Sequence, residues 1–161
     1  MRAELRAVGP DAASLELGLP YLDAVCQETR RLHPAVPIGL RRLTAPFALR
    51  DVELAAGDTM GVAVSLLHSD PVVWPDPELF RPARFIERKY RPFEFAPFGG
   101  GHRRCVGASL ADDELRIALA TILVRLRLRL PPRYARGRVP PSVPHNIATG
   151  PYRSIPFDVI A

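Results

Sequence analysis

The sequence has very few lysines and cysteines, and each shortage excludes a class of protein. Lys89 is the only lysine among 22 Lys and Arg residues, so arginine supplies nearly all the positive charge behind a net charge of +5. A basic chain can bind nucleic acid or anionic surfaces. These arginines are scattered and lie in no nucleic-acid-binding motif, so we expect no nucleic-acid partner. The two cysteines, Cys26 and Cys105, lack paired spacing, which argues against a disulfide framework and favours a reducing, cytoplasmic location.

Long apolar runs are also missing. No uninterrupted apolar segment approaches the ~20 residues needed to span a bilayer. The N-terminal MRAELRAVGP lacks the apolar core of a signal peptide. We therefore expect no membrane segment in this chain. Its 161 residues, 47% hydrophobic and 24% charged, have the composition of one soluble globular domain.

Hydrophobic periodicity divides the chain into an α+β arrangement. Glycines and prolines break residues 1–19 into a short helical stub and a loop. Residues 20–33 have a helical pattern that ends at Pro34, and residues 38–67 predict a small antiparallel β-meander. Residues 108–125 predict a second strong helix.

The C-terminal residues 126–161 predict short strands between turns. The alternating RLRLRL predicts a half-buried strand, since residues of period two face opposite sides of a sheet. A second short strand is expected around His145–Ala148. The final SIPFDVIA predicts a last strand, which we expect to pair with RLRLRL.

Residues 68–97 contain too many prolines for a long helix or strand. They are nevertheless too rich in aromatic residues for a solvated loop, so we expect a coil that packs. A packed coil must satisfy its backbone polar groups, and Arg84 is a candidate to do so from within. The aromatic residues of this segment and its border are Trp74, Phe80, Phe85, Phe93, Phe95 and Phe98.

Cys105 has the clearest chemical potential in the chain. It lies in the glycine-rich basic loop FGGGHRRCVG, residues 98–107, which leads into a helix. The N–H groups of a helix start and the adjacent Arg103 and Arg104 favour the thiolate form. Such a loop could hold a thiolate against a metal or an electrophile, although most free cysteines are small buried apolar residues. The latter role fits Cys26, on the apolar face of the first helix.

Other uses of Cys105 have less support. A thiol enzyme needs a positioned base, and a zinc site needs paired Cys or His spacing. Neither pattern accompanies this cysteine.

Glu28 and Arg31 lie three residues apart on the first helix, so their side chains can meet. Taken alone, the pair predicts a solvated surface interaction that contributes ~0.5 kcal/mol or less.

Three separated motifs together resemble the C-terminal part of the cytochrome P-450 family, the haem-thiolate monooxygenases. ETRR contains an E-x-x-R, FRPARF an F-x-P-x-R-F, and FGGGHRRCVG an F-x-x-G-x-R-x-C-x-G. Each motif is weak alone, but their order and spacing make a specific combination. Their defining residues are Glu28, Arg31, Phe80, Pro82, Arg84, Phe85, Phe98, Gly101, Arg103, Cys105 and Gly107.

The resemblance implies a haem b site. Cys105 would be the axial ligand of the haem iron, whose thiolate pushes electron density to the metal and favours O–O cleavage. Phe98 would shield the sulfur, and Gly107 would let the backbone fold tightly beside it. Arg103 and Arg41 would pair with the haem propionates, because a guanidinium binds carboxylate bidentately.

Arg42 is the alternative propionate partner, since adjacent strand residues face opposite sides of a strand, but the family spacing favours Arg41.

The resemblance also implies structural roles. Glu28, Arg31 and Arg84 would form a buried salt-bridge triad that joins the helix to the packed coil. Residues 35–40 and the turn near residues 148–150 would line the substrate pocket, and His102 is expected to face solvent.

One part of the family's pattern is missing. No A/G-G-x-D/E-T motif of the oxygen-activating helix occurs in this sequence. From the three motifs that are present, the resemblance implies haem and iron binding as part of a monooxygenase that inserts one atom of O2 into an organic substrate. The alternative is a truncated, inactive remnant that binds haem weakly or does not fold alone. Whether this chain by itself is an enzyme stays open.

The resemblance finally implies partners. The complete enzyme would take a small hydrophobic organic substrate. A ferredoxin, flavodoxin or reductase would dock on a basic face. The residues expected to form that face are Arg88, Lys89, Arg91, Arg103 and Arg104.

Overall fold

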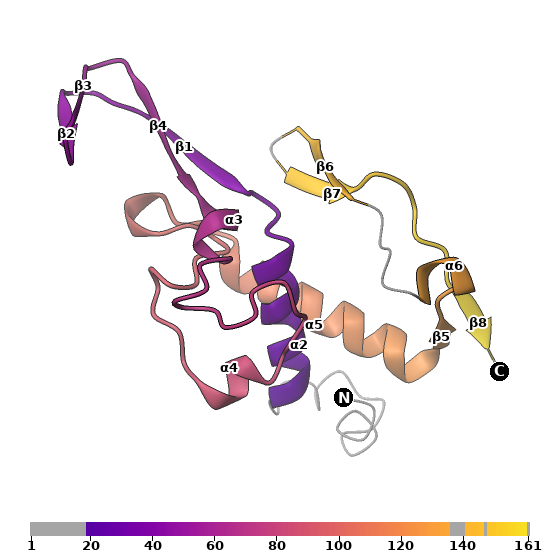
Figure 1. Cartoon of the computed structure of the whole chain (residues 1–161). Coiled ribbons are helices and arrows are strands. Elements are labelled where there is room, and N and C mark those ends of the chain that lie inside the picture. Colours follow the sequence, from indigo (N-terminus) through magenta and orange to yellow (C-terminus); the bar gives the residue numbers. More distant parts are fainter. Residues whose placement is uncertain (1–18, 136–140, 147, 161) are drawn as a thin grey trace.

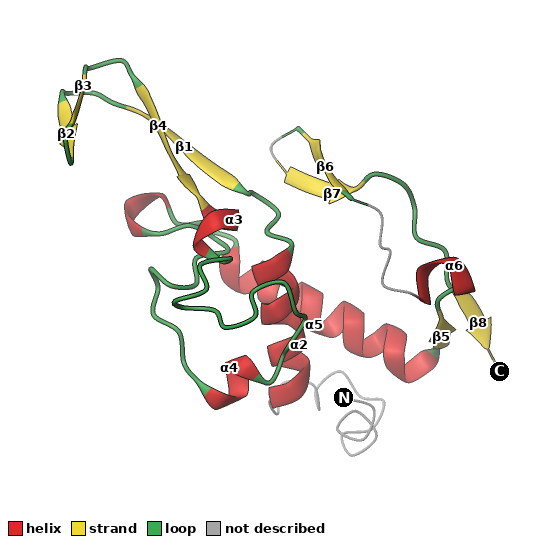
Figure 2. Cartoon of the chain, in the orientation of Figure 1, coloured by secondary structure: helices red, strands yellow, loops and turns green. Residues whose placement is uncertain are grey.

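The computed structural model describes residues 19–135, 141–146 and 148–160. Helices α2 (Pro20–Leu32) and α5 (Ala108–Arg125) cross at the centre, a long hairpin extends to one side, and the last strand lies near the C-terminal end of α5 (Figures 1 and 2). Apart from Leu19, the predicted stub and loop of residues 1–19 lie outside the described residues. The elements are, in chain order, α2 (Pro20–Leu32), β1 (Ile38–Arg42), β2 (Phe47–Leu49), β3 (Val52–Leu54), β4 (Thr59–Ala63), α3 (Val64–Leu67), α4 (Arg84–Glu87), the 3-10 turn η2 (Gly101–Arg103), α5 (Ala108–Arg125), β5 (Arg127–Arg129), α6 (Pro132–Ala135), β6 (Ser142–His145), β7 (Ala148–Pro151) and β8 (Asp158–Ile160).

The hydrophobic core lies between α2 and α5. Leu22 and Cys26 of α2 are buried against Ala120, which is completely buried. The small side chain of Ala120 lets the two helices approach closely. Cys26 thus has the core position expected from its place on the apolar face of the helix. The partly buried residues packed around this cluster are Leu115, Leu119 and Leu123.

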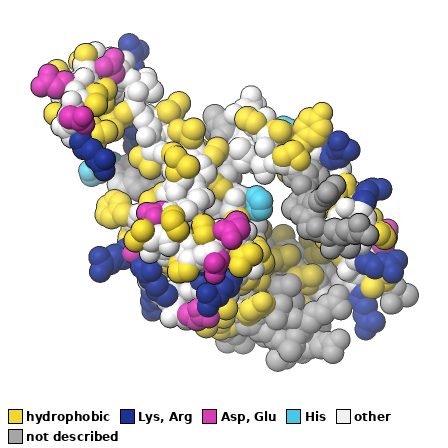
Figure 3. Space-filling model, viewed as in Figure 1, with side chains coloured by type: hydrophobic (Ala, Val, Ile, Leu, Met, Phe, Trp, Pro, Cys, Tyr) yellow, Lys and Arg dark blue, Asp and Glu magenta, His cyan; other side chains and the backbone are white. Residues whose placement is uncertain are grey.

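The apolar stripe of α5 is only partly covered. Leu110 is 63% exposed and Ile122 is 42% exposed, although the periodicity places both on the predicted apolar face. The stripe is wider than the side that α2 covers. Figure 3 shows further hydrophobic side chains at the surface of the visible face.

The segment predicted as a β-meander has a different pairing. β1 pairs with β4, and β2 pairs with β3, both antiparallel. The strands therefore form one hairpin nested at the end of another, rather than a sheet of consecutive neighbours. The expectation of strand over residues 59–67 is also wrong for its last four, which form α3. A helical turn there buries Val64 and His68 together, four residues apart.

The C-terminal strands agree with the sequence in one place and differ in another. β5 pairs antiparallel with β8, as expected for RLRLRL and the final segment. In place of the single strand expected around His145–Ala148, the structure has a hairpin of two strands, in which β6 ends at His145 and β7 begins at Ala148. Asn146 has a φ of 58°, a conformation that asparagine tolerates better than most residues.

Residues 68–97 form the packed coil, interrupted by the single turn of α4. Trp74 is fully buried and stacks on Tyr90, with ring centroids 4.1 Å apart. The packing does not extend to every aromatic residue, since Phe80 is 54% exposed and Phe93 is 83% exposed. The cluster consists of Trp74, Phe85, Tyr90 and Phe95.

Candidate functional site

The loop of residues 98–107 is closed by a backbone hydrogen bond across it. The Cys105 N–H donates to the Phe98 carbonyl at 2.9 Å. Gly99 and Gly101 have φ values of 72° and 62°, which residues with a Cβ rarely adopt. These two glycines let the chain reverse direction between Phe98 and η2, so that Cys105 lies directly before α5.

Cys105 is a free, exposed thiol at this helix start. Gly107 is the N-cap of α5, and its carbonyl accepts the first hydrogen bond of the helix from the Ala111 N–H at 2.9 Å. A Cβ placed on Gly107 would lie 4.0 Å from the Cys105 sulfur. An alanine at position 107 would therefore be in ordinary van der Waals contact with the thiol, and glycine leaves that space open.

The predicted propionate partners lie on two different elements. Arg103 lies in η2 and is exposed, and its guanidinium makes no hydrogen bond or ion pair within the described residues. Arg41 is exposed on β1 and donates only to the neighbouring Leu40 carbonyl, at 2.6 Å. Arg42 instead donates to the Gly57 carbonyl at 3.2 Å, across the hairpin. Among the two strand arginines, Arg41 therefore has the guanidinium that is freer to bind a carboxylate.

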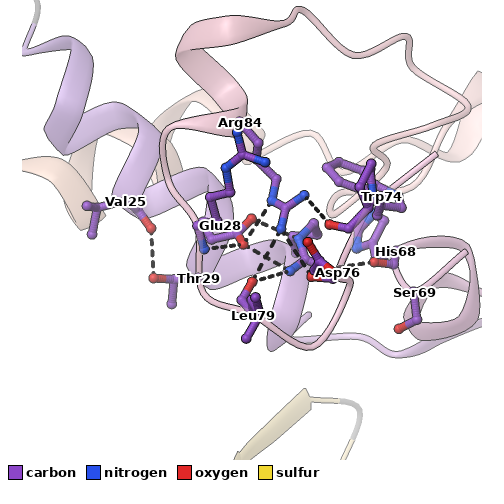
Figure 4. Close-up of polar contacts among 12 residues, drawn as sticks. Val25, Glu28, Thr29, His68, Ser69, Trp74, Asp76, Leu79 and Arg84 are labelled. Carbon is purple, nitrogen blue, oxygen red and sulfur yellow. Dashed lines mark hydrogen bonds and ion pairs between the residues drawn. The ribbon is translucent and has the colours of Figure 1, made fainter. Parts of the chain in front are cut away.

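The three side chains Glu28, Arg31 and Arg84 meet in a buried network. Arg31 binds Glu28 through two hydrogen bonds, Nε to Oε2 at 2.8 Å and Nη2 to Oε1 at 2.9 Å. Arg84 Nε donates to Glu28 Oε1 at 3.1 Å. Glu28 is 0% exposed and Arg31 1% exposed, so the surface pair that their spacing alone predicts is wrong. Figure 4 shows Glu28 and Arg84 pointing toward each other from α2 and α4.

The environment keeps the Glu28 carboxyl charged. Burial by itself would raise its pKa, but hydrogen bonds from Arg31 and from the Arg81 amide, with the charges of Arg31 and Arg84, hold the pKa below its ordinary value. The Arg81 N–H donates to Glu28 Oε1 at 2.9 Å. A charged carboxylate thus binds two guanidinium groups and one backbone amide.

Arg84 also satisfies the backbone of the packed coil, as the sequence indicates. Its Nη1 donates to the Pro75 carbonyl at 3.0 Å, and its Nη2 lies 3.3 Å from the Asp76 carbonyl. Nη2 is also 3.4 Å from the Leu79 carbonyl, and Figure 4 shows Asp76 and Leu79 beside the network that contains Arg84. One buried side chain therefore organises the turn between Trp74 and α4.

Two contacts were not predicted from the sequence. The buried His68 accepts a hydrogen bond at its Nε2 from the Ala96 N–H, at 3.0 Å. Thr149 of β7 donates its N–H to the Ala35 carbonyl at 2.7 Å and its hydroxyl to the Pro34 carbonyl at 3.0 Å. The two segments predicted to line a substrate pocket are thereby joined. Neither contact has a local sequence signal, because the partners are 28 and more than a hundred positions apart.

A cleft of about 720 Å³ lies between α2, the segment before η2 and the first half of α5. Arg30 of α2 pairs with Asp112 of α5, and its guanidinium lies 5.2 Å from the centre of the Phe98 ring. Arg116 of α5 reaches Asp23 of α2 at 3.4 Å. These pairs join α2 to α5, and the Arg30–Phe98 contact connects α2 to the start of the ligand loop. The charged residues that line the cleft are Asp23, Arg30, Arg104, Asp112, Asp113 and Arg116.

The residues predicted to form a basic face are largely free of internal ion pairs. Among them, Arg88 is the exception, since it pairs with Glu94 at 2.6 Å and lies over the Tyr90 ring. The other members are exposed and form no ion pair with a described carboxylate. They are Lys89, Arg91, Arg103 and Arg104. His102 beside them is exposed, as expected.

Cys105 offers a metal one sulfur ligand, so the site suits a metal ion whose other ligands come from a cofactor. No group of three or more His, Cys, Asp or Glu side chains within the described residues could hold a metal ion. A porphyrin supplies four nitrogen ligands, so its iron needs only one thiolate from the protein on this side. The exposed thiol, the free Arg103 and the space beside Gly107 fit that requirement.

Comparisons with known proteins agree on one family. The sequence profile of Cytochrome P450 matches residues 5–152. Thromboxane-A synthase of Macaca fascicularis is 34% identical over 155 residues, which are 94% of this chain and 28% of that protein. Putative cytochrome P450 135B1 of Mycobacterium tuberculosis is 40% identical over 124 residues, or 77% of this chain and 26% of that protein.

A solved structure gives the same result. The retinoic acid bound cyanobacterial CYP120A1 matches with a TM-score of 0.74 and 33% identity, over 81% of this chain and 31% of that chain. The chain therefore spans less than a third of the length of these relatives. No helix in the described part of the chain is long and apolar enough to cross a membrane. Its helices and small antiparallel sheets form part of the P450 fold, and the chain belongs to the cytochrome P450 family of haem-thiolate monooxygenases.

Proposed function

We propose that this chain provides the thiolate side of a haem b site in a cytochrome P450 monooxygenase. Cys105 would bind the iron, and Arg103 and Arg41 would bind the two propionates. The single observation that carries the proposal is the exposed Cys105 thiol, placed before α5 by the hydrogen bond from its own N–H to Phe98.

The chain's own residues have distinct tasks in this proposal. The 98–107 loop holds the exposed thiol directly before α5, where a haem iron could reach it. Phe98, half-buried under Arg30, limits water at the loop. When bound, haem supplies the O2-activating chemistry by which one oxygen atom enters a small hydrophobic organic substrate. Thr149 and residues 34–35 hold together the two segments proposed to border that substrate.

Haem binding is tested with the full chain, reconstituted with haem, reduced and exposed to carbon monoxide. We expect a thiolate-type shift of the Soret band that Cys105→Ser abolishes. Cys26→Ser is the matched control, because burial raises the pKa of the Cys26 thiol and keeps it a neutral core group. A shift that is absent from the unmodified chain, or is unchanged in Cys105→Ser, contradicts the proposal.

Electrons for such a reaction would come from a ferredoxin, flavodoxin or reductase in the cytoplasm. The face formed by Lys89, Arg91, Arg103 and Arg104 favours an acidic partner, because complementary charge accelerates association. Arg91→Glu should weaken binding of an acidic [2Fe–2S] ferredoxin to the haem-loaded chain, and added salt should weaken binding to the unmodified chain. Equal binding by Arg91→Glu and the unmodified chain would argue against this face.

A second candidate is a remnant without monooxygenase activity that binds haem weakly or does not fold alone. The small α2–α5 core favours it, together with the exposed side chains Leu110 and Ile122 of α5. Apolar surface of this kind is an aggregation risk. Thermal unfolding followed by circular dichroism separates the candidates. A cooperative transition that shifts upward with haem supports the haem-binding chain, and its absence supports the remnant.

A further inference from the structure

His68 occupies the centre of the packed coil without any assigned role. It is 0% exposed and lies at the C-terminal end of α3. Its ring is 5.2 Å from the Phe95 ring and 6.1 Å from the Trp74 ring, measured between centroids. A buried imidazole among aromatic rings could be packing alone, so its hydrogen bonds decide what it does.

The two ends of His68 contact two different parts of the molecule. Its backbone carbonyl accepts a hydrogen bond from Arg31 Nη1 at 2.8 Å. Its side-chain Nε2 accepts one from the Ala96 N–H at 3.0 Å. Arg31 belongs to the buried network on Glu28, whereas Ala96 lies two residues before Phe98, where the ligand loop begins.

The Ala96 contact requires a neutral imidazole. An N–H donor can bind Nε2 only when that nitrogen carries no proton, so the proton lies on Nδ1. Burial, together with the nearby Arg31 charge, lowers the pKa of His68 to about 4, although an interaction of the imidazole with the Arg31 backbone acts to raise it. The His68 side chain is therefore a hydrogen-bond acceptor at neutral pH. A leucine or phenylalanine of similar size has no acceptor atom and could not take its place.

The hydrogen bonds continue from Ala96 to the cysteine. The Ala96 carbonyl accepts from the Gly99 N–H at 3.0 Å, and the Phe98 carbonyl accepts from the Cys105 N–H at 2.9 Å. Residues 96–99 thus form a turn whose first amide is bound by His68. The other side of that turn holds the backbone of Cys105.

We propose that His68 is a positioning residue that couples the buried Glu28–Arg31–Arg84 network to the Cys105 loop, by binding the Ala96 amide through Nε2. The purpose of this coupling rests on the proposed haem-thiolate function. The coupling itself consists only of hydrogen bonds between residues of this chain. It predicts that removing the Nε2 acceptor loosens the turn and the Cys105 amide. The network on Glu28 should remain, because Arg31 binds the backbone of residue 68 rather than its side chain.

Three variants of the full chain separate positioning from packing. His68→Leu removes the acceptor and keeps an apolar side chain. His68→Gln can place its side-chain oxygen near the position of Nε2, whereas the shorter side chain of His68→Asn cannot reach it. The readout is hydrogen exchange of individual amides by NMR on the haem-free chain, which does not depend on haem binding.

We expect exchange at Ala96, Gly99 and Cys105 to accelerate roughly fivefold or more in the Leu and Asn variants, as for loss of one hydrogen bond of ordinary strength. The Gln variant should restore protection. The control amide is Arg81, which donates to Glu28 and should be unchanged in all three variants. Unchanged exchange at Ala96 and Cys105 in the Leu variant overturns the proposal. Equal acceleration at Arg81 and Cys105 in all three variants, including Gln, also overturns it and leaves His68 a packing residue.

A second arm tests the consequence for the cofactor. In the haem-loaded, reduced, carbon monoxide-bound chain, His68→Leu should lose part of the thiolate-type Soret intensity, and His68→Gln should retain it. If the unmodified chain gives no such band, the proposed function fails while the exchange result stands. If the band is present and equal in all variants, the coupling to the cysteine is overturned.

Discussion

Arg84 and Glu28 are 56 positions apart in the sequence, yet Arg84 Nε donates to Glu28 Oε1 at 3.1 Å with both side chains buried. This contact holds α4 and the coil before it against α2. Arg31 completes the network and connects it to His68. The stability of the coil that leads to the Cys105 loop therefore depends on one buried carboxylate.

Replacing that carboxylate should be costly. Glu28→Gln leaves the guanidinium groups of Arg31 and Arg84 buried without a negative partner, so we expect a loss of ~3–5 kcal/mol in the free energy of unfolding. Urea denaturation followed by Trp74 fluorescence measures it. Glu87→Gln is the matched control, because its pair with Arg81 is exposed and should contribute about 0–1 kcal/mol. Similar losses in both variants would show that burial of the network does not matter.

Stability should fall as the pH falls from 6.5. The pKa of His68 is lowered from 6.5 to about 4 in the folded chain, so the unfolded chain binds a proton in this range that the folded chain does not. The free energy of unfolding should decrease by ~1.4 kcal/mol per pH unit within this window, through His68 alone. Its charged neighbour is Arg31, and the other groups around it are the Trp74 and Phe95 rings.

The His68 contribution can be isolated with two variants. His68→Gln should flatten the slope between pH 6.5 and about 4.5, while the exposed His102→Gln should keep it. Below about pH 4.5 a further loss should begin in both variants. There Glu28, whose pKa is held below 4.5 in the folded chain, takes up a proton first in the unfolded chain. An unchanged slope in His68→Gln would contradict the assignment.

Thr149 should matter for the attachment of the C-terminal hairpin. Thr149→Val preserves shape and the N–H bond to Ala35, but it removes the hydroxyl donor to Pro34. We expect a loss of ~1 kcal/mol in the free energy of unfolding and faster exchange of the Thr149 amide. Thr59→Val on β4 is the control, since its side chain is exposed and makes no hydrogen bond within the described residues. Equal effects would indicate that the hairpin is held by other contacts.

The close approach of α2 and α5 should make Ala120 intolerant of larger side chains. Ala120→Leu adds three carbon atoms where the side chain is fully buried, and overpacking of this kind costs ~1–3 kcal/mol. Ala118→Leu, two residues earlier on the exposed side of the same helix, should be nearly neutral. Thermal unfolding compares the two variants. A neutral Ala120→Leu would mean that the helices separate at little cost.

Local patterns predicted the two long helices well, but they missed the short helices α3, α4 and α6 and the pairing of β1 with β4. Residues 108–125 match α5 at both ends, because an apolar repeat and a glycine N-cap are properties of one continuous segment. The nested pairing of β1 with β4 was missed, because the same strands with short connections are compatible with a meander. The choice between the two depends on contacts between residues about twenty positions apart.

The residues of the candidate site also fall into two groups, those that the sequence identifies and those whose roles only the tertiary structure reveals. The residues of the three motifs, with Cys105 at a helix start and Arg84 among coil carbonyls, could be chosen from the sequence, because their spacing is itself the signal. The burial of Glu28 could not be inferred from local spacing, since a pair three apart on a helix looks the same whether it faces water or protein. It was expected only from the family resemblance, and the structure buries Glu28. His68 and Thr149 carry no local signal at all. Their roles depend on segments that meet only when the coil folds over α2 and the C-terminal hairpin reaches residues 34–35, and long-range contacts of that kind are decided by packing rather than by periodicity.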